Sequence, residues 1–209
     1  IAKNLNDAGM SKGVTLSLQS LDELTLDLIK RRNMKINDFS SLIKTYTNEG
    51  IPTYTELILG LPGESKQTFM AGIDVLFKAG QHNGLNIYPA MVLPNAQFND
   101  EDYKKLHGIE FVETPMLLSH GTPEVDGLQE RYEIVVKTND LPVEDWVESI
   151  VYAWVVQALH CMNLTQQIAR YMHRVKNVSY TEFYTVIISW SKNSFVLSSN
   201  IETLRHTAR

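Results

Sequence analysis

The stretch Thr53-Tyr-Thr-Glu-Leu-Ile-Leu59, followed directly by Gly60-Leu-Pro-Gly-Glu64, decides how this chain is expected to fold. Its first part is rich in β-branched, aromatic and large apolar residues, which favour a strand. Its second part is rich in Gly and Pro, which predicts a tight loop. Ser65 then suits the N-cap of a helix that ends before Gly80. The apolar face of this helix contains Phe69, Ile73, Leu76 and Phe77.

The residues before this stretch predict another strand and two more helices. Residues 13–17, Gly-Val-Thr-Leu-Ser, have the composition of a short buried strand. Ser20-Leu-Asp-Glu23 has the pattern of a capping box, which predicts a helix from there to about Arg32. A further helix is expected to begin at Asn37 and to end at Gly50.

The residues after the stretch complete the pattern of an α/β fold. Residues 85–92, Leu-Asn-Ile-Tyr-Pro-Ala-Met-Val, predict a third strand, in which Pro89 requires an edge position or a bulge. Strands that alternate with helices imply right-handed crossovers and a parallel sheet. Ligands of such folds bind at the carboxyl ends of the strands, so we expect a site near the loops after residues 19, 59 and 92.

The second half of the chain has a different character. A short helix is expected after Asp100, a strand at 131–138, and a long amphipathic helix that begins near Val143 and breaks near Asn163. Further helices are predicted at 180–190 and 198–207. We therefore divide the chain into residues 1–98, an α/β region, and residues 99–209, a mainly helical region.

Composition excludes several classes of protein. The chain has 209 residues, 44% of them hydrophobic and 21% charged, which excludes a disordered chain. A net charge of −5 predicts no nucleic-acid partner, and no apolar run is long enough for insertion into a membrane. The single cysteine, Cys161, can form no internal disulfide and cannot alone hold a metal cluster. With no signal peptide in view, we expect a cytoplasmic protein. Because residues 1–9 resemble the last turns of a helix, we also expect a piece of a longer protein.

Three features at the predicted strand ends have chemical potential, and each has an ordinary structural explanation. Ser17 and Gln19 would lie on one face of the first strand, although Gln19 could instead help Ser20 to cap the next helix. Arg31 could hold a carboxylate through two parallel hydrogen bonds, or could simply suit a helix C-terminus. The loop at 60–65 could bind an anion, or could be a plain tight turn. The six histidines are scattered, and Cys161 is interpreted as a core residue.

Four ordered motifs together are more specific than any one of them. They are the run Val14-Thr-Leu-Ser-Leu-Gln-Ser-Leu-Asp-Glu, the basic run Lys30-Arg-Arg-Asn33, the run Glu56-Leu-Ile-Leu-Gly-Leu-Pro-Gly-Glu64, and Ile87-Tyr-Pro-Ala-Met-Val-Leu-Pro-Asn95. In this order they resemble the second half of the barrel of a radical S-adenosylmethionine (radical SAM) enzyme. The match is nearest to the subgroup that often carries a cobalamin-binding domain.

This resemblance implies a fold and cofactors. Residues 1–98 would form the second half of a partial (β/α) barrel with parallel strands. SAM would be cleaved reductively to a 5′-deoxyadenosyl radical at a four-iron, four-sulfur cluster. The cysteine ligands of that cluster, and any cobalamin domain, would lie outside this chain, so this chain alone is expected to be inactive.

The resemblance also implies a set of residues that contact SAM. Carried over by position, they are Ser17, Gln19, Arg31, Ile58, Gly60 and Tyr88. Gln19 would lie near the ribose and carboxylate, Arg31 would pair with the carboxylate, and Ile58 would contact the adenine. Glu56 departs from the family pattern, which often has Gly there. The resemblance assigns no catalytic residue and no metal ligand within the chain.

Two other functions stay open at this point. The chain could be a non-enzymatic α/β module whose helical tail, residues 143–209, docks a partner through Trp146, Trp154 and Trp190. It could also be an ordinary barrel enzyme that binds a phosphate at the 60–65 loop. In each case the small-molecule or other substrate is undetermined. Because half of a barrel leaves open edges, we expect strand 131–138, a helix or self-association with a second copy to cover at least one of them.

Overall fold

The computed structural model describes residues 1–115 and 131–208, and its centre is a three-stranded parallel sheet. The strands are β1 (Val14–Gln19), β2 (Thr53–Leu59) and β3 (Gly84–Pro89), in the order β1-β2-β3. This confirms the predicted α/β class and the parallel arrangement. Half of a (β/α) barrel would contain such a sheet, and the barrel itself stays a prediction.

Helices cover one face of this sheet. After α1 (Ala2–Asp7), helices α2 (Glu23–Leu28) and α3 (Ile36–Asn48) connect β1 to β2, and α4 (Lys66–Lys78) connects β2 to β3. Alternate residues of β2 are buried, and Leu57 and Leu59 share a core with Phe39 of α3 and Phe69 of α4. The helices at this face were predicted because apolar residues recur along them at helical spacing.

Ser65 caps α4 as the sequence predicts. Its hydroxyl accepts a hydrogen bond from the backbone N–H of Thr68, and the Thr68 hydroxyl accepts one from the Ser65 N–H. This reciprocal arrangement satisfies two of the N–H groups that the first turn of a helix leaves free. The α4 helix is therefore fixed at the end nearest the Gly-rich loop.

The capping box predicted at Ser20 is wrong, and so is the predicted end of that helix. Asp22 is the N-cap of α2, because its carboxylate accepts from the Thr25 N–H at 2.9 Å. The helix ends at Leu28, four residues before Arg32. Lys30 turns the chain in a left-handed conformation, with φ +55°. This turn normally contains Gly, so the sequence lacked the usual signal.

The third predicted strand is split between two sheets. Residues 84–89 form β3, and Pro89 lies in this outer strand as predicted. After Ala90 the chain enters β4 (Met91–Val92), which pairs antiparallel with β6 (Arg131–Lys137) in a second sheet of order β4-β6-β5. The strand predicted at 131–138 therefore exists, but it pairs with neither edge of the parallel sheet.

The strand β5 (Glu110–Pro115) was not predicted from the sequence. It follows the 3₁₀ turn η1 (Gln97–Asn99) and the short helix α5 (Glu101–His107), whose start near Asp100 was predicted. Most of its side chains are exposed and polar, so it has little apolar alternation. Cross-strand ion pairs join Glu110 to Lys137 and Glu113 to Arg131, at 2.5 and 2.8 Å.

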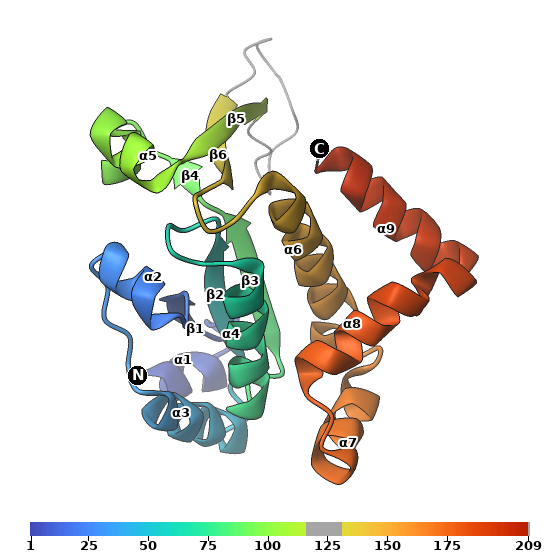
Figure 1. Cartoon of the computed structure of the whole chain (residues 1–209). Coiled ribbons are helices and arrows are strands. Elements are labelled where there is room, and N and C mark those ends of the chain that lie inside the picture. Colours follow the sequence, from blue (N-terminus) through green and yellow to red (C-terminus); the bar gives the residue numbers. More distant parts are fainter. Residues whose placement is uncertain (116–130, 209) are drawn as a thin grey trace, which may run out of the picture.

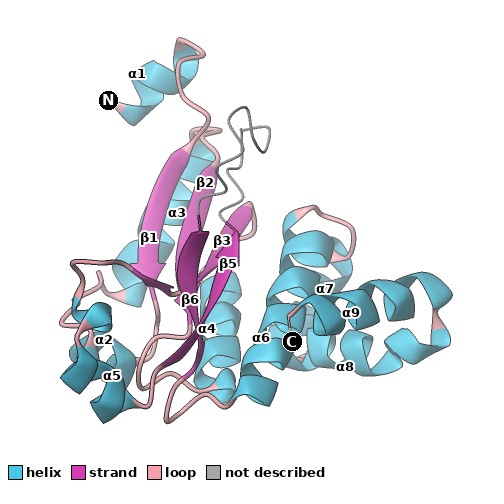
Figure 2. Cartoon of the chain, turned by 90° about the horizontal axis from the view of Figure 1, so that it is seen from above, coloured by secondary structure: helices cyan, strands magenta, loops and turns pink. Residues whose placement is uncertain are grey.

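The remainder of the described chain is helical (Figure 1), as predicted. Its elements are α6 (Val143–Val155), the π-helical segment η2 (Val156–Cys161), α7 (Gln166–Lys176), α8 (Tyr180–Trp190), the 3₁₀ turn η3 (Ser191–Asn193) and α9 (Phe195–Thr207). The predicted break near Asn163 is confirmed, whereas α7 was not predicted. The segment η2 packs against β3, so a helical segment lies beside this outer strand. Figure 2 shows α6, α7, α8 and α9 grouped on one side of the strands.

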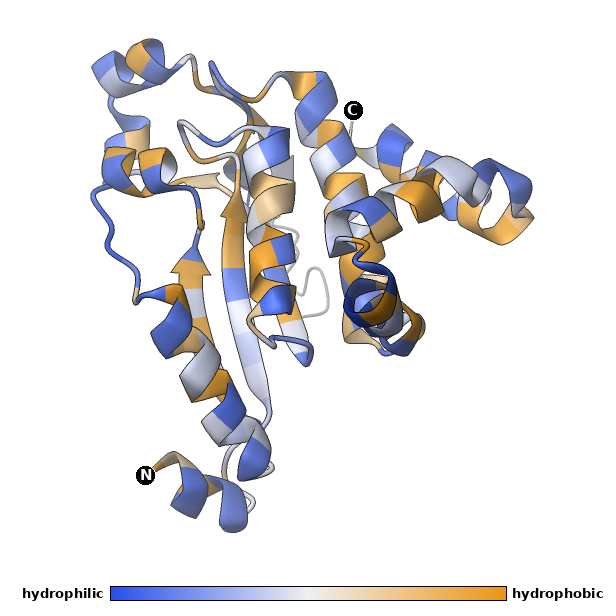
Figure 3. Cartoon of the chain, turned by 60° about the horizontal axis from the view of Figure 1, so that its bottom comes forward, coloured by the Kyte–Doolittle hydropathy of each residue, from blue (hydrophilic) through white to orange (hydrophobic). Residues whose placement is uncertain are grey.

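The helical region shares one hydrophobic core with the α/β region. Val151 and Tyr152 of α6 pack in the same cluster as Phe69 and Leu76 of α4. Figure 3 shows hydrophobic and hydrophilic residues interspersed on the helices near the C-terminus. None of the helices in residues 1–115 and 131–208 combines the length and the apolar character needed to cross a membrane.

Candidate functional site

The face of the parallel sheet opposite α3 and α4 brings together side chains from all three strands. In the β-sheet register, Ser17 lies beside Glu56, and Glu56 lies beside Asn86. The next pair along β2 and β3 is Ile58 beside Tyr88. Because side chains alternate along a strand, Glu56 and Ile58 share a face that excludes the buried Leu57 and Leu59.

Ser17 and Glu56 form a hydrogen-bonded pair on this face. The Ser17 hydroxyl donates to a carboxylate oxygen of Glu56. Glu56 was noted in the sequence only as a departure from a pattern, and its position opposite Ser17 could not be read without the register. The face thus presents a half-buried carboxylate, which can accept hydrogen bonds from hydroxyl or amino groups.

Gln19 combines three unusual features at the end of β1. Its φ is +62°, a left-handed conformation that residues other than Gly seldom adopt. The register of β1 and β2 shifts between Ser17 and Gln19, so alternation no longer fixes the direction of the Gln19 side chain. Its Oε1 atom is buried and has no hydrogen-bond partner among the described residues. Strained backbone and an unpartnered buried acceptor favour a binding role over simple helix capping.

The Arg31 side chain forms a hydrogen bond with the end of β1 and does not cap the end of α2. Its Nη2 donates to the backbone carbonyl of Ser17 at 2.7 Å, and its Nε donates to Oδ1 of Asn33 at 3.1 Å. Asn33 in turn donates to the Ser20 carbonyl at 2.8 Å. Within residues 1–115 and 131–208, Arg31 forms no ion pair. A guanidinium has five N–H donors, so donors remain for an anion.

Gly60 and Ile58 lie where the second sheet meets the first. Gly60 has φ +98°, and a Cβ atom placed on it would lie 3.3 Å from the carbonyl oxygen of Val135 in β6. Ile58 packs beside Leu61 and Val135 in a second hydrophobic cluster. The glycine is therefore required by its conformation and by the close approach of β6. Tyr88, by contrast, is 51% exposed.

Glu64 is a buried acidic residue for which the sequence alone predicted no role. Only 2% of it is exposed, and its Oε1 accepts a hydrogen bond from the Ser20 hydroxyl at 2.5 Å. Burial is the main cause that raises the pKa of this carboxyl to about 8. The pair ties the loop after β2 to the loop after β1. Its signal in the sequence was the loop motif Gly60-Leu-Pro-Gly-Glu64.

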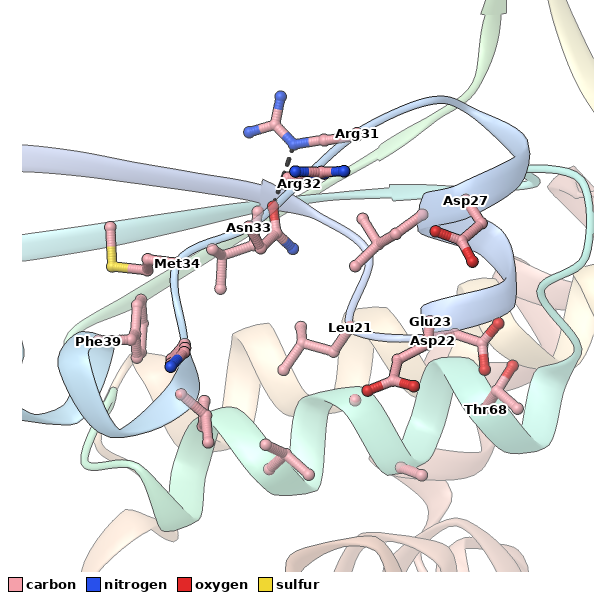
Figure 4. A pocket seen from close by; sticks show the side chains of 17 residues that line it. Leu21, Asp22, Glu23, Asp27, Arg31, Arg32, Asn33, Met34, Phe39 and Thr68 are labelled. Atoms are coloured by element: carbon pink, nitrogen blue, oxygen red, sulfur yellow. Dashed lines mark hydrogen bonds between the residues drawn. The ribbon is translucent and has the colours of Figure 1, made fainter.

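A cavity of about 770 Å³ lies on the other, helical side of the sheet. Figure 4 shows that Leu21, Phe39 and Met34 line it together with the acidic Asp22, Glu23 and Asp27. Arg31 and Asn33 also border this cavity. The sequence predicted no site here, and of the six residues singled out as SAM contacts only Arg31 reaches it.

The structure offers no metal centre in the residues that it describes. No three histidine, cysteine, aspartate or glutamate side chains gather there as metal ligands would. Burial raises the pKa of the Cys161 thiol to about 11, which leaves it protonated at neutral pH. His82 and His160, scattered in the sequence, lie with their Nδ1 and Nε2 atoms 3.0 Å apart. This places two of the six histidines in contact.

Comparison with known proteins identifies relatives of the chain. No family model matches it. It is 37% identical over 185 residues, or 88% of its length, to "Cobalamin-dependent radical SAM methyltransferase TokK" of Streptomyces tokunonensis. Over this length its homologues are radical SAM methyltransferases. It is also 35% identical over the same length to "2-(S-pantetheinyl)-carbapenam-3-carboxylate methyltransferase" of Streptantibioticus cattleyicolor. The chain spans only 27% of the length of each of these curated relatives.

Five of the six residues predicted to contact SAM lie in two groups in the structure. Ser17, Gln19 and Arg31 meet at the carboxyl end of β1, where Arg31 binds the Ser17 carbonyl. Ile58 and Tyr88 lie side by side on β2 and β3. The first group is polar and incompletely hydrogen-bonded, whereas the second is apolar and aromatic. This arrangement can hold a ligand that has one charged end and one flat apolar part.

The three tryptophans of the alternative interpretation, a docking tail, do not form one exposed stripe. Trp146 is 4% exposed and Trp154 packs against the main core, whereas Trp190 is 56% exposed. Two of the three side chains therefore pack in or against the hydrophobic core. The helical spacing that suggested a docking face is explained by the packing of α6 on α4.

Proposed function

We propose that this chain supplies part of the SAM-binding face of a radical SAM methyltransferase. The sequence identity to a cobalamin-dependent radical SAM methyltransferase supports the family and the reaction class. The observation that carries the assignment of a face is found at the carboxyl end of β1. There Arg31 forms no ion pair with the described residues, and Gln19 Oε1 has no hydrogen-bond partner among them.

The chemistry of these residues fits the parts of SAM. Arg31 retains N–H donors in a planar fork, which suits the carboxylate of the methionine part. The buried Oε1 of Gln19 lacks a donor, which a ribose hydroxyl or an amino group would supply. Ile58 and Tyr88 offer an apolar wall for the adenine. Glu56, held by Ser17, is a further acceptor for a hydroxyl or amino group.

In such an enzyme bound SAM would supply a methyl group and, at an iron–sulfur cluster outside this chain, the source of the radical chemistry. The residues of this chain orient SAM and shield it from water, because a bound cofactor needs fixed contacts and exclusion of water. We place the cluster ligands and the cobalamin site outside this chain. Accordingly, the chain alone is proposed to bind neither and to be inactive.

The test uses the intact protein that contains this chain, purified without oxygen and reconstituted with iron and sulfide. Equilibrium dialysis measures SAM binding, and release of 5′-deoxyadenosine measures cleavage. Arg31→Gln should weaken SAM binding about tenfold or more, because a charged hydrogen bond is lost. Arg32→Gln is the matched control, since Arg32 is the exposed neighbour with the same charge.

Each outcome decides the proposal. Loss of SAM affinity in Arg31→Gln but not in Arg32→Gln supports the assignment of the face. Equal affinities of both variants would reject the role of Arg31. If the reconstituted wild-type protein neither binds nor cleaves SAM, the radical SAM function is rejected, and a non-enzymatic module becomes the better interpretation.

A further inference from the structure

A second cavity, of about 390 Å³, lies between α4, α7 and the start of α8. We call it the α7 cavity. Its lining residues include Phe77, Lys78, His82, Arg170, His173, Arg174 and Tyr180. It lies at the end of α4 that precedes β3, whereas the proposed SAM face lies at the carboxyl ends of the strands. Figure 1 shows α7 and this end of α4 at the bottom of the view.

The α7 cavity concentrates positive charge in an acidic chain. The chain has a net charge of −5, yet two arginines, one lysine and two histidines line this one cavity. Arg170 and Arg174 form no ion pair within residues 1–115 and 131–208. They are four positions apart on α7, so they lie on one face, where like charges destabilise a helix unless they are neutralised.

One carboxylate near the α7 cavity is already used. Asp74 accepts from the Lys78 ammonium at 2.6 Å and from the backbone N–H of Tyr180 at 2.7 Å. The helix dipole explains a basic residue in the last turn of α7, such as Arg174, but not Arg170, which lies in the middle of the helix. Arg170 is exposed and forms no ion pair with the described residues, so its guanidinium can bind an anion in the cavity.

Tyr180 adds a hydroxyl donor to the lining of the α7 cavity. Only 3% of this residue is exposed, and it lines the α7 cavity. Its backbone N–H binds Asp74. Tyr180 and Arg170 can both donate hydrogen bonds to an anion.

His82 and His173 complete the donor set of the α7 cavity. His82 uses Nδ1 toward His160, and His173 places its Nδ1 at 3.1 Å from the Val178 carbonyl. The Nε2 atom of each ring forms no hydrogen bond within the described residues, so each can face a ligand. The rings of Phe77, His173 and Tyr180 add flat surface, with the His173 and Tyr180 centroids 4.8 Å apart.

We propose that the α7 cavity binds the oxyanion group, phosphate or carboxylate, of a small molecule. Arg170 and Arg174 hold the anion, the Tyr180 hydroxyl donates to it, and the rings contact the organic part. The volume lies in the range of small-molecule sites. This site is separate from the SAM face, so its occupation does not depend on the proposed function.

The test is calorimetric titration of the purified protein at low salt with inorganic phosphate, pyrophosphate and acetate. Saturable binding at millimolar concentration or below supports the proposal, and the preferred probe distinguishes a phosphate from a carboxylate ligand. Arg170→Gln should weaken binding about tenfold, and Tyr180→Phe several-fold, because the ring and its packing remain. Lys44→Gln, on the exposed side of α3, removes the same charge elsewhere and should leave binding unchanged.

Two results would overturn this inference. One is the absence of saturable binding of all three anions by the wild-type protein. The other is an equal loss of affinity in Arg170→Gln and Lys44→Gln, which would indicate a general effect of net charge. Circular dichroism of each variant shows whether it is folded. If Arg170→Gln is unfolded, Tyr180→Phe alone decides, and unchanged affinity in it rejects the role of the hydroxyl.

Discussion

The buried carboxyl of Glu64 makes stability depend on pH in a direction that the structure fixes. Burial raises its pKa in the folded protein from 4.5 to about 8. Between these values the unfolded chain releases a proton that the folded chain keeps. The contribution of Glu64 to stability is therefore greatest below about pH 4.5, falls as pH rises, and levels off above about pH 8.

Replacing Glu64 with Gln removes this effect and keeps the packing. The amide has nearly the same shape, and its oxygen can still accept from the Ser20 hydroxyl. From the two pKa values, the unfolding free energy of Glu64→Gln relative to wild type should increase by about 4 kcal/mol between about pH 5 and about pH 9. This value is of the order of the whole stability of a small domain.

Urea denaturation followed by circular dichroism at several pH values measures this difference. Other titrating groups are present in both proteins, so they cancel when the variant is compared with wild type at each pH. Glu23→Gln, in the exposed first turn of α2, removes a nearby carboxylate and is the control. A difference between Glu64→Gln and wild type that stays constant with pH would refute the reasoning, because Glu64 would then ionise freely in the folded protein.

Three further predictions concern stability. Burial lowers the pKa of His82 to about 4, so stability should fall as pH decreases below 6.5, and His82→Gln should remove about 3 kcal/mol of that loss in urea titrations. Gly60→Ala should cost about 1–3 kcal/mol in thermal melts, because φ is +98° and Val135 is close; Gly50→Ala, with open space around it, should cost less. Ser65→Ala should cost about 1 kcal/mol through the lost cap, and an unchanged melting temperature would contradict this.

The fold of the α/β region was predictable because its local signals agree with its packing. Strand β2 has the predicted bounds, and Ser65 caps α4 as its position before an apolar helix indicates. The second sheet was not predictable in the same way. β5 is exposed and polar, and only its pairing with β6 brings Glu110 to Lys137. Such pairing depends on contacts that are distant in sequence.

The candidate site was predictable as a set of residues but not as a geometry. Alternation placed Ser17 on a face, and the register then placed Glu56 beside it. The sequence could not indicate that Gln19 has a left-handed backbone, because Gln rarely adopts it. Nor could it indicate the contact of His82 with His160, which are far apart in the chain. The α7 cavity likewise lies between α4 and the helices α7 and α8, which are far apart in the chain.

The position of Arg31 shows how a local turn can decide between two functions for one residue. The N–H of Arg31 binds the Leu26 carbonyl at 2.8 Å, and the N–H of Lys30 binds the Asp27 carbonyl at 3.1 Å, which together form a Schellman turn. This turn ends α2 early and directs the chain back toward β1. The Arg31 guanidinium therefore reaches the Ser17 carbonyl and leaves the helix end. Had α2 continued to Arg32, as the sequence suggested, this charge would serve the helix dipole. Because Lys30 adopts the left-handed conformation, the charge is available at the strand end, where we propose that the carboxylate of SAM is bound.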